Sequence, residues 1–151
     1  MACKKLSFFI VFVSAFLSAC SGSADQNPQK TLEICTYKIG EHSFELELAD
    51  EPHERQKGLM FRKELAEKSG MIFLWDKPAY RAMWMKNTYI PLDMIFIRDE
   101  RVVGMVANTT PFSLDSITVD SAVDAIVELK AGSIKKYDLI PDMKAELHCQ
   151  N

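Results

Sequence analysis

Six polar or aromatic side chains are candidates for binding chemistry because they stand among apolar residues. Four of them fall within the apolar segment MWMKNTYIPLDMIFI, and the other two precede and follow it. The six are Arg55, Trp84, Lys86, Asn87, Asp93 and Glu128. A few convergent polar groups beside an apolar and aromatic lining are typical of small-ligand pockets, so the set predicts a binding site. The alternative is a structural network, since buried polar groups generally have to be hydrogen-bonded.

Lys86 and Asp93 are the pair within this set that the sequence predicts to be in contact. Residues 91–97 are apolar on both faces after their start, which indicates a strand inside a covered sheet, with Asp93 near its beginning. Lys86 lies at the end of the strand predicted just before it. A charge removed from water has to be paired or hydrogen-bonded, so we expect an ion pair between the two side chains.

Two other chemistries stay open as alternatives. Asp93 or Glu128 could act as the general base of a small hydrolase, which would also need a nearby acid or nucleophile. Thioether sulfur suits Cu(I), although methionine is also common core filler. The methionines in question are Met60, Met71, Met83, Met85 and Met94.

Common enzyme and cofactor motifs are missing from the sequence. It contains no G-x-S-x-G elbow and no phosphate-binding P-loop, and His53-Glu54 fails the H-E-x-x-H zinc pattern because Lys57 stands at its fifth position. We therefore expect a non-catalytic binding module for a small molecule or an envelope protein, with no cofactor and no metal.

The apolar periodicity predicts a mainly β domain that carries the six candidates. Strands are expected at 31–39, 43–49, 70–75, 81–86, 91–98, 101–108, 121–130 and 143–148, and short helices at 51–57 and 132–139. The span 121–130 could also be helical, but its Val and Ile residues favour a strand. Seven or eight short strands with one or two short helices indicate one antiparallel sandwich or barrel-like domain.

The N-terminus has the pattern of an export signal. Lys4 and Lys5 precede 14 uncharged residues, a run too short to span a bilayer core, which needs about 20. The run ends in Leu-Ser-Ala-Cys, which resembles the bacterial lipobox. The resemblance implies removal of residues 1–19, attachment of lipid to Cys20, and membrane anchorage. Ser21, rather than Asp, then favours the outer membrane, facing the periplasm, in bacteria with two membranes.

A polar tether and one domain follow the predicted cleavage point. Residues 20–30 carry no aliphatic side chain larger than alanine, so they predict a flexible tether, and residues 31–151 are long enough for one core. Loss of Lys4 and Lys5 leaves 16 basic against 21 acidic residues. This balance disfavours nucleic acid as a partner.

Two cysteines remain in the predicted domain, Cys35 and Cys149. An even number of cysteines in an exported domain favours a disulfide. Two buried free thiols are the alternative.

Several blocks of the sequence resemble a bacterial and archaeal family known as domain of unknown function 192. The similarity extends over about residues 32 to 147, with order and spacing preserved. It implies a compact, mostly β domain that is often exported, and it brings no established activity. The blocks are Glu54-Arg55, GLMFR at 58–62, GMIF at 70–73, WMKNT at 84–88, IPLD at 90–93, Phe96-Ile97, and VEL at 127–129 before Ala131-Gly132.

Overall fold

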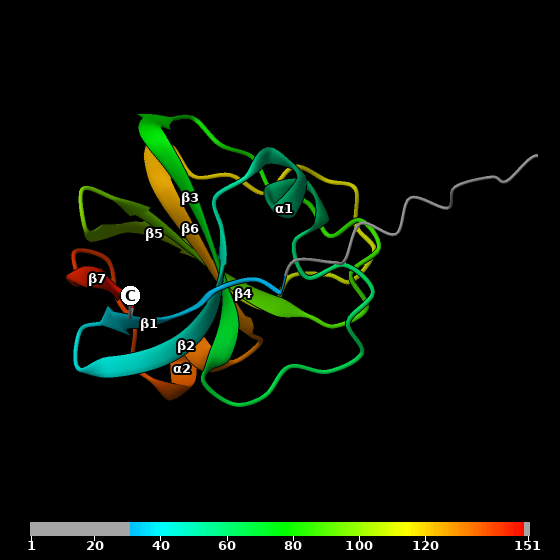
Figure 1. The fold of residues 1–151 in the computed structure, drawn as a ribbon, viewed down its shortest axis with the longest axis horizontal. Helices are drawn as coiled ribbons and strands as arrows, with labels where there is room; N and C mark the ends of the chain where they lie inside the picture. The colour runs from blue at the N-terminus through cyan, green and yellow to red at the C-terminus, as the bar shows by residue number, and fades with distance from the viewer. Residues whose placement is uncertain (1–30, 150–151) are drawn as a thin grey trace, which may run out of the picture. The chain divides into compact units, whose positions relative to one another are not determined.

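The strands form one curled sheet that accounts for most of the fold. The computed structural model describes residues 31–149, so the predicted signal segment and tether, with Cys20, lie outside the described residues. The sheet has seven strands in the order β5-β4-β6-β3-β2-β1-β7 and curls into a half-barrel (Figure 1). The strands are β1 (Ile34–Ile39), β2 (His42–Ala49), β3 (Ser69–Ala79), β4 (Leu92–Arg98), β5 (Arg101–Val106), β6 (Val123–Lys130) and β7 (Ala145–His148).

The prediction of a mainly β, barrel-like domain is confirmed. All neighbouring strands are antiparallel except β2 and β3, which run parallel. The edge strands β5 and β7 lie on the same side of the molecule in Figure 1, where the Val102 N–H donates to the Met143 carbonyl at 3.0 Å and the Ala145 N–H to the Glu100 carbonyl at 2.8 Å. These bonds close part of the barrel seam.

The prediction of a strand at 81–86 is wrong. Only an isolated bridge forms there, in which Met83 and Ile117 exchange two backbone hydrogen bonds of 2.9 Å. The alternation at 81–86 is typical of a strand because the backbone is locally extended. The partner is a loop, however, and Asn87 turns the chain with a positive φ of 55°. Residues 81–88 therefore lie outside the sheet as a loop.

The two helices are short and lie over opposite faces of the sheet. Helix α1 (Pro52–Lys57) lies near the end of β2, and α2 (Ser133–Lys136) follows β6. Tyr137, which ends α2, packs edge-on against Phe44 of β2 with ring centroids 5.3 Å apart. No described helix has the length and apolar character needed to cross a bilayer.

Two apolar clusters occupy the two faces of the sheet. The concave face holds side chains from all seven strands, together with Tyr137 and Leu139. The convex face of β3, β4 and β6 is covered by loop residues such as Leu59, Leu65 and Met85. Met94 and Phe96 of β4 belong to the convex cluster, and Ile95 and Ile97 belong to the concave one. Because side chains alternate along a strand, this division decides where the polar groups of the strand point.

The disulfide prediction is confirmed. Cys35 of β1 is bonded to Cys149, which follows β7, and their Cα atoms are 4.4 Å apart. The bond is possible because β1 and β7 are neighbours, with Thr36 opposite His148. It closes a loop of more than 100 residues, which the chain-entropy model values at about 4–5 kcal/mol.

Candidate functional site

Glu128 stands at the centre of the convex face of the sheet. Its neighbours across the adjacent strands are Met71 on β3 and Met94 on β4. Neither thioether can replace water as a partner for a carboxylate, and Glu128 is 3% exposed. Its side chain makes no hydrogen bond or ion pair within the described part of the chain. Burial raises the pKa of this carboxyl from 4.5 to about 8, so the group is mostly protonated at neutral pH.

A glycine fixes the backbone beside this carboxyl. Gly70 lies opposite Leu129, and a Cβ at residue 70 would come within 2.1 Å of the Glu128 carbonyl oxygen. Any other residue would therefore push β6 away from β3. This contact explains why the β3–β6 pairing in front of Glu128 starts with a glycine.

The Glu128 carboxyl opens into a cavity of about 230 Å³, named the Glu128 pocket. Its apolar wall consists of Leu59, Phe73, Trp75 and Met83. Helix α1 and the 82–88 loop form its sides. The lining residues are Pro52, Arg55, Gln56, Lys57, Gly58, Leu59, Met60, Phe73, Trp75, Ala82, Met83, Trp84, Lys86, Thr88 and Glu128.

Three cationic side chains lie around the Glu128 pocket, and two of them lie over tryptophan rings. The Lys86 ammonium lies 4.9 Å from the ring centroid of Trp84, which is 44% exposed. The Arg55 guanidinium lies 5.5 Å from the ring centroid of Trp75 and donates to the Leu74 carbonyl at 2.9 Å. Lys57 is the third cation. The site therefore combines a neutral buried acid, an aromatic wall and a cationic rim.

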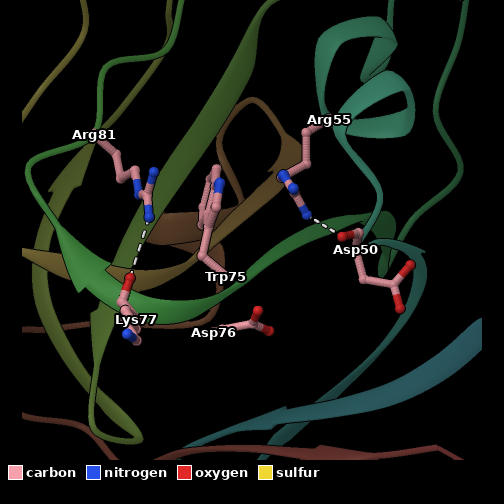
Figure 2. A pocket seen from close by; sticks show the side chains of 6 residues that line it. All are labelled: Asp50, Arg55, Trp75, Asp76, Lys77 and Arg81. Carbon is pink, nitrogen blue, oxygen red and sulfur yellow. Dashed lines mark hydrogen bonds between the residues drawn. The ribbon is translucent and has the colours of Figure 1, made fainter.

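A second cavity of about 290 Å³ adjoins this site and shares Arg55 and Trp75 with it. Figure 2 shows Trp75 standing between the guanidiniums of Arg55 and Arg81, and the Arg81 group lies 4.6 Å from the ring centroid. Arg81 donates to the Lys77 carbonyl at 3.1 Å, and Arg55 donates to the Asp50 carbonyl. The Arg81 Nε is buried and has no partner among the described residues.

Four of the six candidate residues line the Glu128 pocket, namely Arg55, Trp84, Lys86 and Glu128. Asn87 lies beside it and donates from Nδ2 to the Met60 sulfur at 3.8 Å. Its carbonyl accepts the Phe61 N–H at 2.8 Å. Asn87 therefore supports the loop that carries Met60, and its side chain is not part of the lining.

Asp93 lies on the opposite face, so the predicted Lys86–Asp93 ion pair is wrong. Asp93 is fully buried, and its two carboxylate oxygens accept the backbone N–H groups of Asn108 and Ile134, each at 2.8 Å. Lys86 and Asp93 are both described, and no ion pair joins them. The pairing fails because the Lys86 loop covers the convex face, whereas Asp93 points to the concave one. For Asp93, the structural network is the interpretation that fits.

The five methionines proposed as Cu(I) ligands are divided between core and pocket. Met71, Met85 and Met94 are buried in the convex-face cluster. The Met85 sulfur accepts a hydrogen bond from the Thr109 hydroxyl at 3.2 Å. Met60 and Met83 line the Glu128 pocket. Core packing is therefore the role that the structure gives to three of the five.

From the sequence, no role is predicted for Phe73, Trp75 or Lys57, and Met60 and Met83 are candidates only as copper ligands. Phe73 and Trp75 follow Met71 at two-residue intervals on β3, and Met71 is opposite Glu128. Strand alternation thus places all three on the face of Glu128. That signal is usable only once the pairing of β3 with β6 is known.

The comparisons with known proteins agree with the sequence blocks. The family model DUF192, described as "Uncharacterized ACR", matches residues 35–147. The chain belongs to the DUF192 family. No curated protein matches it.

Two solved structures are similar to this DUF192 domain. One, from Sinorhizobium meliloti 1021, is described as a "putative transcription regulator". It has 32% sequence identity and a TM-score of 0.75, over 78% of this chain and 95% of that one. The other, a protein of unknown function from Novosphingobium aromaticivorans DSM 12444, has 36% identity and a TM-score of 0.75, over 79% of this chain and 89% of that one.

Proposed function

We propose that this DUF192 protein is a lipid-anchored, non-catalytic protein of the cell envelope, whose domain binds a small ligand in the Glu128 pocket. One observation carries the binding proposal: the carboxyl of Glu128, a residue only 3% exposed, has no hydrogen-bond partner within residues 31–149 and faces a cavity with an aromatic wall. Buried polar groups are nearly always paired. A lone carboxyl that opens into a cavity therefore favours a bound partner over a purely structural role.

The chemistry of the lining narrows the ligand class. Arg55, Lys57 and Lys86 favour an anionic group at the rim, and Phe73 and Trp84 favour a planar apolar body. The protonated Glu128 would donate a hydrogen bond to an acceptor on the ligand. We propose a small aromatic or heterocyclic acid. Its affinity should fall as pH rises through about 8, because Glu128 then ionises and repels it.

Benzoate, benzamide and benzylamine are suitable probes, added to the full chain in neutral detergent with labelled methionine methyl groups. Benzoate should shift the Met60 and Met83 methyl signals and bind more tightly than the other two. Lys86→Gln should weaken benzoate about three- to tenfold, as expected for one partly exposed charge contact. Lys63→Gln, an equal charge change at an exposed residue outside the pocket, should leave affinity unchanged.

The variant Glu128→Gln tests the role of the carboxyl itself. It should remove the loss of benzoate affinity between pH 7 and 9, because glutamine does not ionise. Absence of benzoate binding at the Met60 and Met83 methyls would overturn the proposal. So would a pH profile that Glu128→Gln leaves unchanged.

The hydrolase alternative rests on the same carboxyl, since a raised pKa in a cleft suits a general acid. Asp93 does not fit this role, because both of its oxygens accept backbone N–H groups on the other face. Thr88 carries the pocket's only hydroxyl among the described residues, and it donates to the Lys86 carbonyl at 3.2 Å. Hydrolysis of phenyl esters by the wild type, lost in Glu128→Gln, would favour the hydrolase over the binding module.

The anchoring proposal is supported by the lipobox-like segment 17–20 and by the disulfide, which suits an oxidising compartment. Mass spectrometry of the mature N-terminus should find Cys20 as the first residue, carrying diacylglycerol. Cys20→Ala should leave the chain unlipidated and outside the membrane fraction. A mature chain that begins elsewhere and bears no lipid would contradict this part.

A further inference from the structure

The concave side of the half-barrel has one end closed by α2 and one end open. At the closed end, the Asp93 carboxylate near the start of β4 holds the N–H of Ile134 in α2. The opposite end of β4, at Ile97, borders a cavity of about 470 Å³, named the acidic mouth. Its lining comes from five strands and the loops next to them, and barrel mouths are frequent ligand sites.

The acidic mouth carries carboxylates and no basic side chain among its lining residues. Asp99 is compensated by Arg98, whose Nε lies 3.4 Å from its carboxylate, and Asp124 accepts the Asp99 N–H at 3.1 Å. Within residues 31–149, the carboxylates of Asp50, Asp76 and Glu100 have no such partner. The five acidic residues in the lining are Asp50, Asp76, Asp99, Glu100 and Asp124.

The hydroxyl group of a buried tyrosine at this mouth supplies a second observation. Tyr37 is 3% exposed and lines the cavity, yet its hydroxyl makes no hydrogen bond within residues 31–149. A buried tyrosine hydroxyl usually has a partner. Burial and the charges of Asp124 and Glu100 raise the pKa of Tyr37, so the phenol stays neutral with lone pairs free to accept from a donor.

The spacing of the carboxylates in the acidic mouth indicates which kind of cation could bind there. Among the described residues, the only group of three His, Cys, Asp or Glu ligand atoms within 4.8 Å is Glu33, Cys35 and Cys149. Two of these form the disulfide. No three carboxylates of the mouth are therefore close enough to hold one metal ion together, and the lining also includes apolar side chains such as Leu74 and Leu147.

We propose that the acidic mouth binds an organic ammonium ion with an aliphatic body, such as an alkyl diamine. The ammonium groups would donate to the carboxylates and to the Tyr37 hydroxyl, and the methylene chain would pack on Leu74, Ile97 and Leu147. Trp75 borders both cavities, but none of the residues proposed to contact the diamine lines the Glu128 pocket, so this proposal does not rest on ligand binding there.

The test titrates the full chain in neutral detergent with 1,5-diaminopentane, followed by calorimetry and by the Tyr37 ring signals. Pentanol and Mg²⁺ serve as the uncharged and the metal probes. Diaminopentane should bind, whereas pentanol should not and Mg²⁺ should be clearly weaker. Binding should weaken with added salt, because exposed charges are screened.

Three substitutions locate the site. Tyr37→Phe and Asp124→Asn should each weaken diaminopentane about tenfold, the size expected for one hydrogen bond to a charged group. Asp76→Asn, at an exposed residue whose loss leaves the core intact, should weaken it about threefold or more. Asp120→Asn, an equal charge change outside the mouth, should leave affinity unchanged.

Three results would overturn the proposal: no diaminopentane binding at 10 mM (about the weakest useful affinity), equal weakening by Asp120→Asn and Asp76→Asn, or tighter binding of Mg²⁺ than of the diamine. None of them would overturn the proposal for the Glu128 pocket, because none of the residues substituted here lines that pocket.

Discussion

Glu128 and Asp93 are two buried carboxyls on neighbouring strands of one sheet, and their surroundings differ completely. Glu128 lies opposite Met94, and Asp93 lies opposite Leu129, one step along the same ladder. That step sends the two side chains to opposite faces. Asp93 receives two backbone N–H groups, whereas Glu128 lies between methionines and opens into a cavity.

The comparison shows that the burial of an acidic residue does not by itself decide whether the residue is structural or binds a ligand. Two backbone N–H groups donate to the oxygens of Asp93, so this side chain joins β4 to α2 and to the segment after β5. Glu128 gains no such compensation, and its carboxyl is held mostly neutral at pH 7. We interpret Asp93 as part of the scaffold and Glu128 as a group available to a ligand.

Asp93→Ala should have the largest effect on folding. The free energy of unfolding should fall by about 3–6 kcal/mol, because two buried N–H groups lose their acceptor at about 1–3 kcal/mol each and a small cavity remains. Asp93→Asn should lose less unfolding free energy, since asparagine keeps one acceptor oxygen. Urea unfolding measures both. A loss below about 1 kcal/mol for the alanine variant would remove Asp93 from the scaffold.

Glu128→Gln should stabilise the domain in a pH-dependent way. The pKa of Glu128 is raised on folding, so the native state holds a proton that the unfolded state releases, and stability falls as pH rises from about 4.5 to about 8. The full shift corresponds to an upper figure of about 5 kcal/mol; we expect a gain of about 2–4 kcal/mol at pH 9, since the cavity admits water.

The gain from Glu128→Gln should shrink towards zero by about pH 4.5, where glutamate is protonated in both states. Melting temperatures of the variant and the wild type at pH 5, 7 and 9 measure it. Glu64→Gln, at an exposed residue, is the matched control, and its difference in melting temperature from the wild type should not change with pH. A gain for Glu128→Gln that does not depend on pH would mean that the carboxyl does not titrate in this range.

Lys86→Met should have the smallest effect, a change within about 1 kcal/mol. The Lys86 ammonium lies over an exposed tryptophan, and such contacts are worth about 0.5–1 kcal/mol. A buried ion pair with Asp93 would instead cost about 3–5 kcal/mol. In a double-mutant cycle, Lys86→Met and Asp93→Ala should be additive within about 0.5 kcal/mol. A larger coupling would indicate that the two residues interact.

The sequence predicts the elements of this fold better than it predicts how they face one another. The alternation in β2 and the doubly apolar pattern of β4 follow from side-chain periodicity, and both strands form where expected. The alternation of side chains along β4 already predicts that Asp93 and Met94 point to opposite faces of the sheet. However, the pairing of β4 with β6 depends on contacts distant in sequence, and a slip of one residue would exchange the faces of Glu128 and Asp93.

The Lys86–Asp93 error has the same origin. Proximity in sequence favours a contact, but residues 81–88 leave the sheet and bond to the loop around Ile117. Lys86 therefore lies over the face opposite Asp93. Arg55 and Glu128, although far apart in sequence, line one pocket because α1 and β6 border the same cavity on the convex side.

The most direct test of this account is the pKa of the Glu128 side chain. Carbon-13 NMR of glutamate-labelled protein, with Glu128→Gln used to assign the signal, follows the carboxyl carbon from pH 4 to 10, a range that spans the ordinary and the raised pKa. The account predicts a midpoint near 8. A midpoint near 4.5 would show that the carboxylate is already solvated or paired, and would contradict the proposal that Glu128 is held neutral for a ligand.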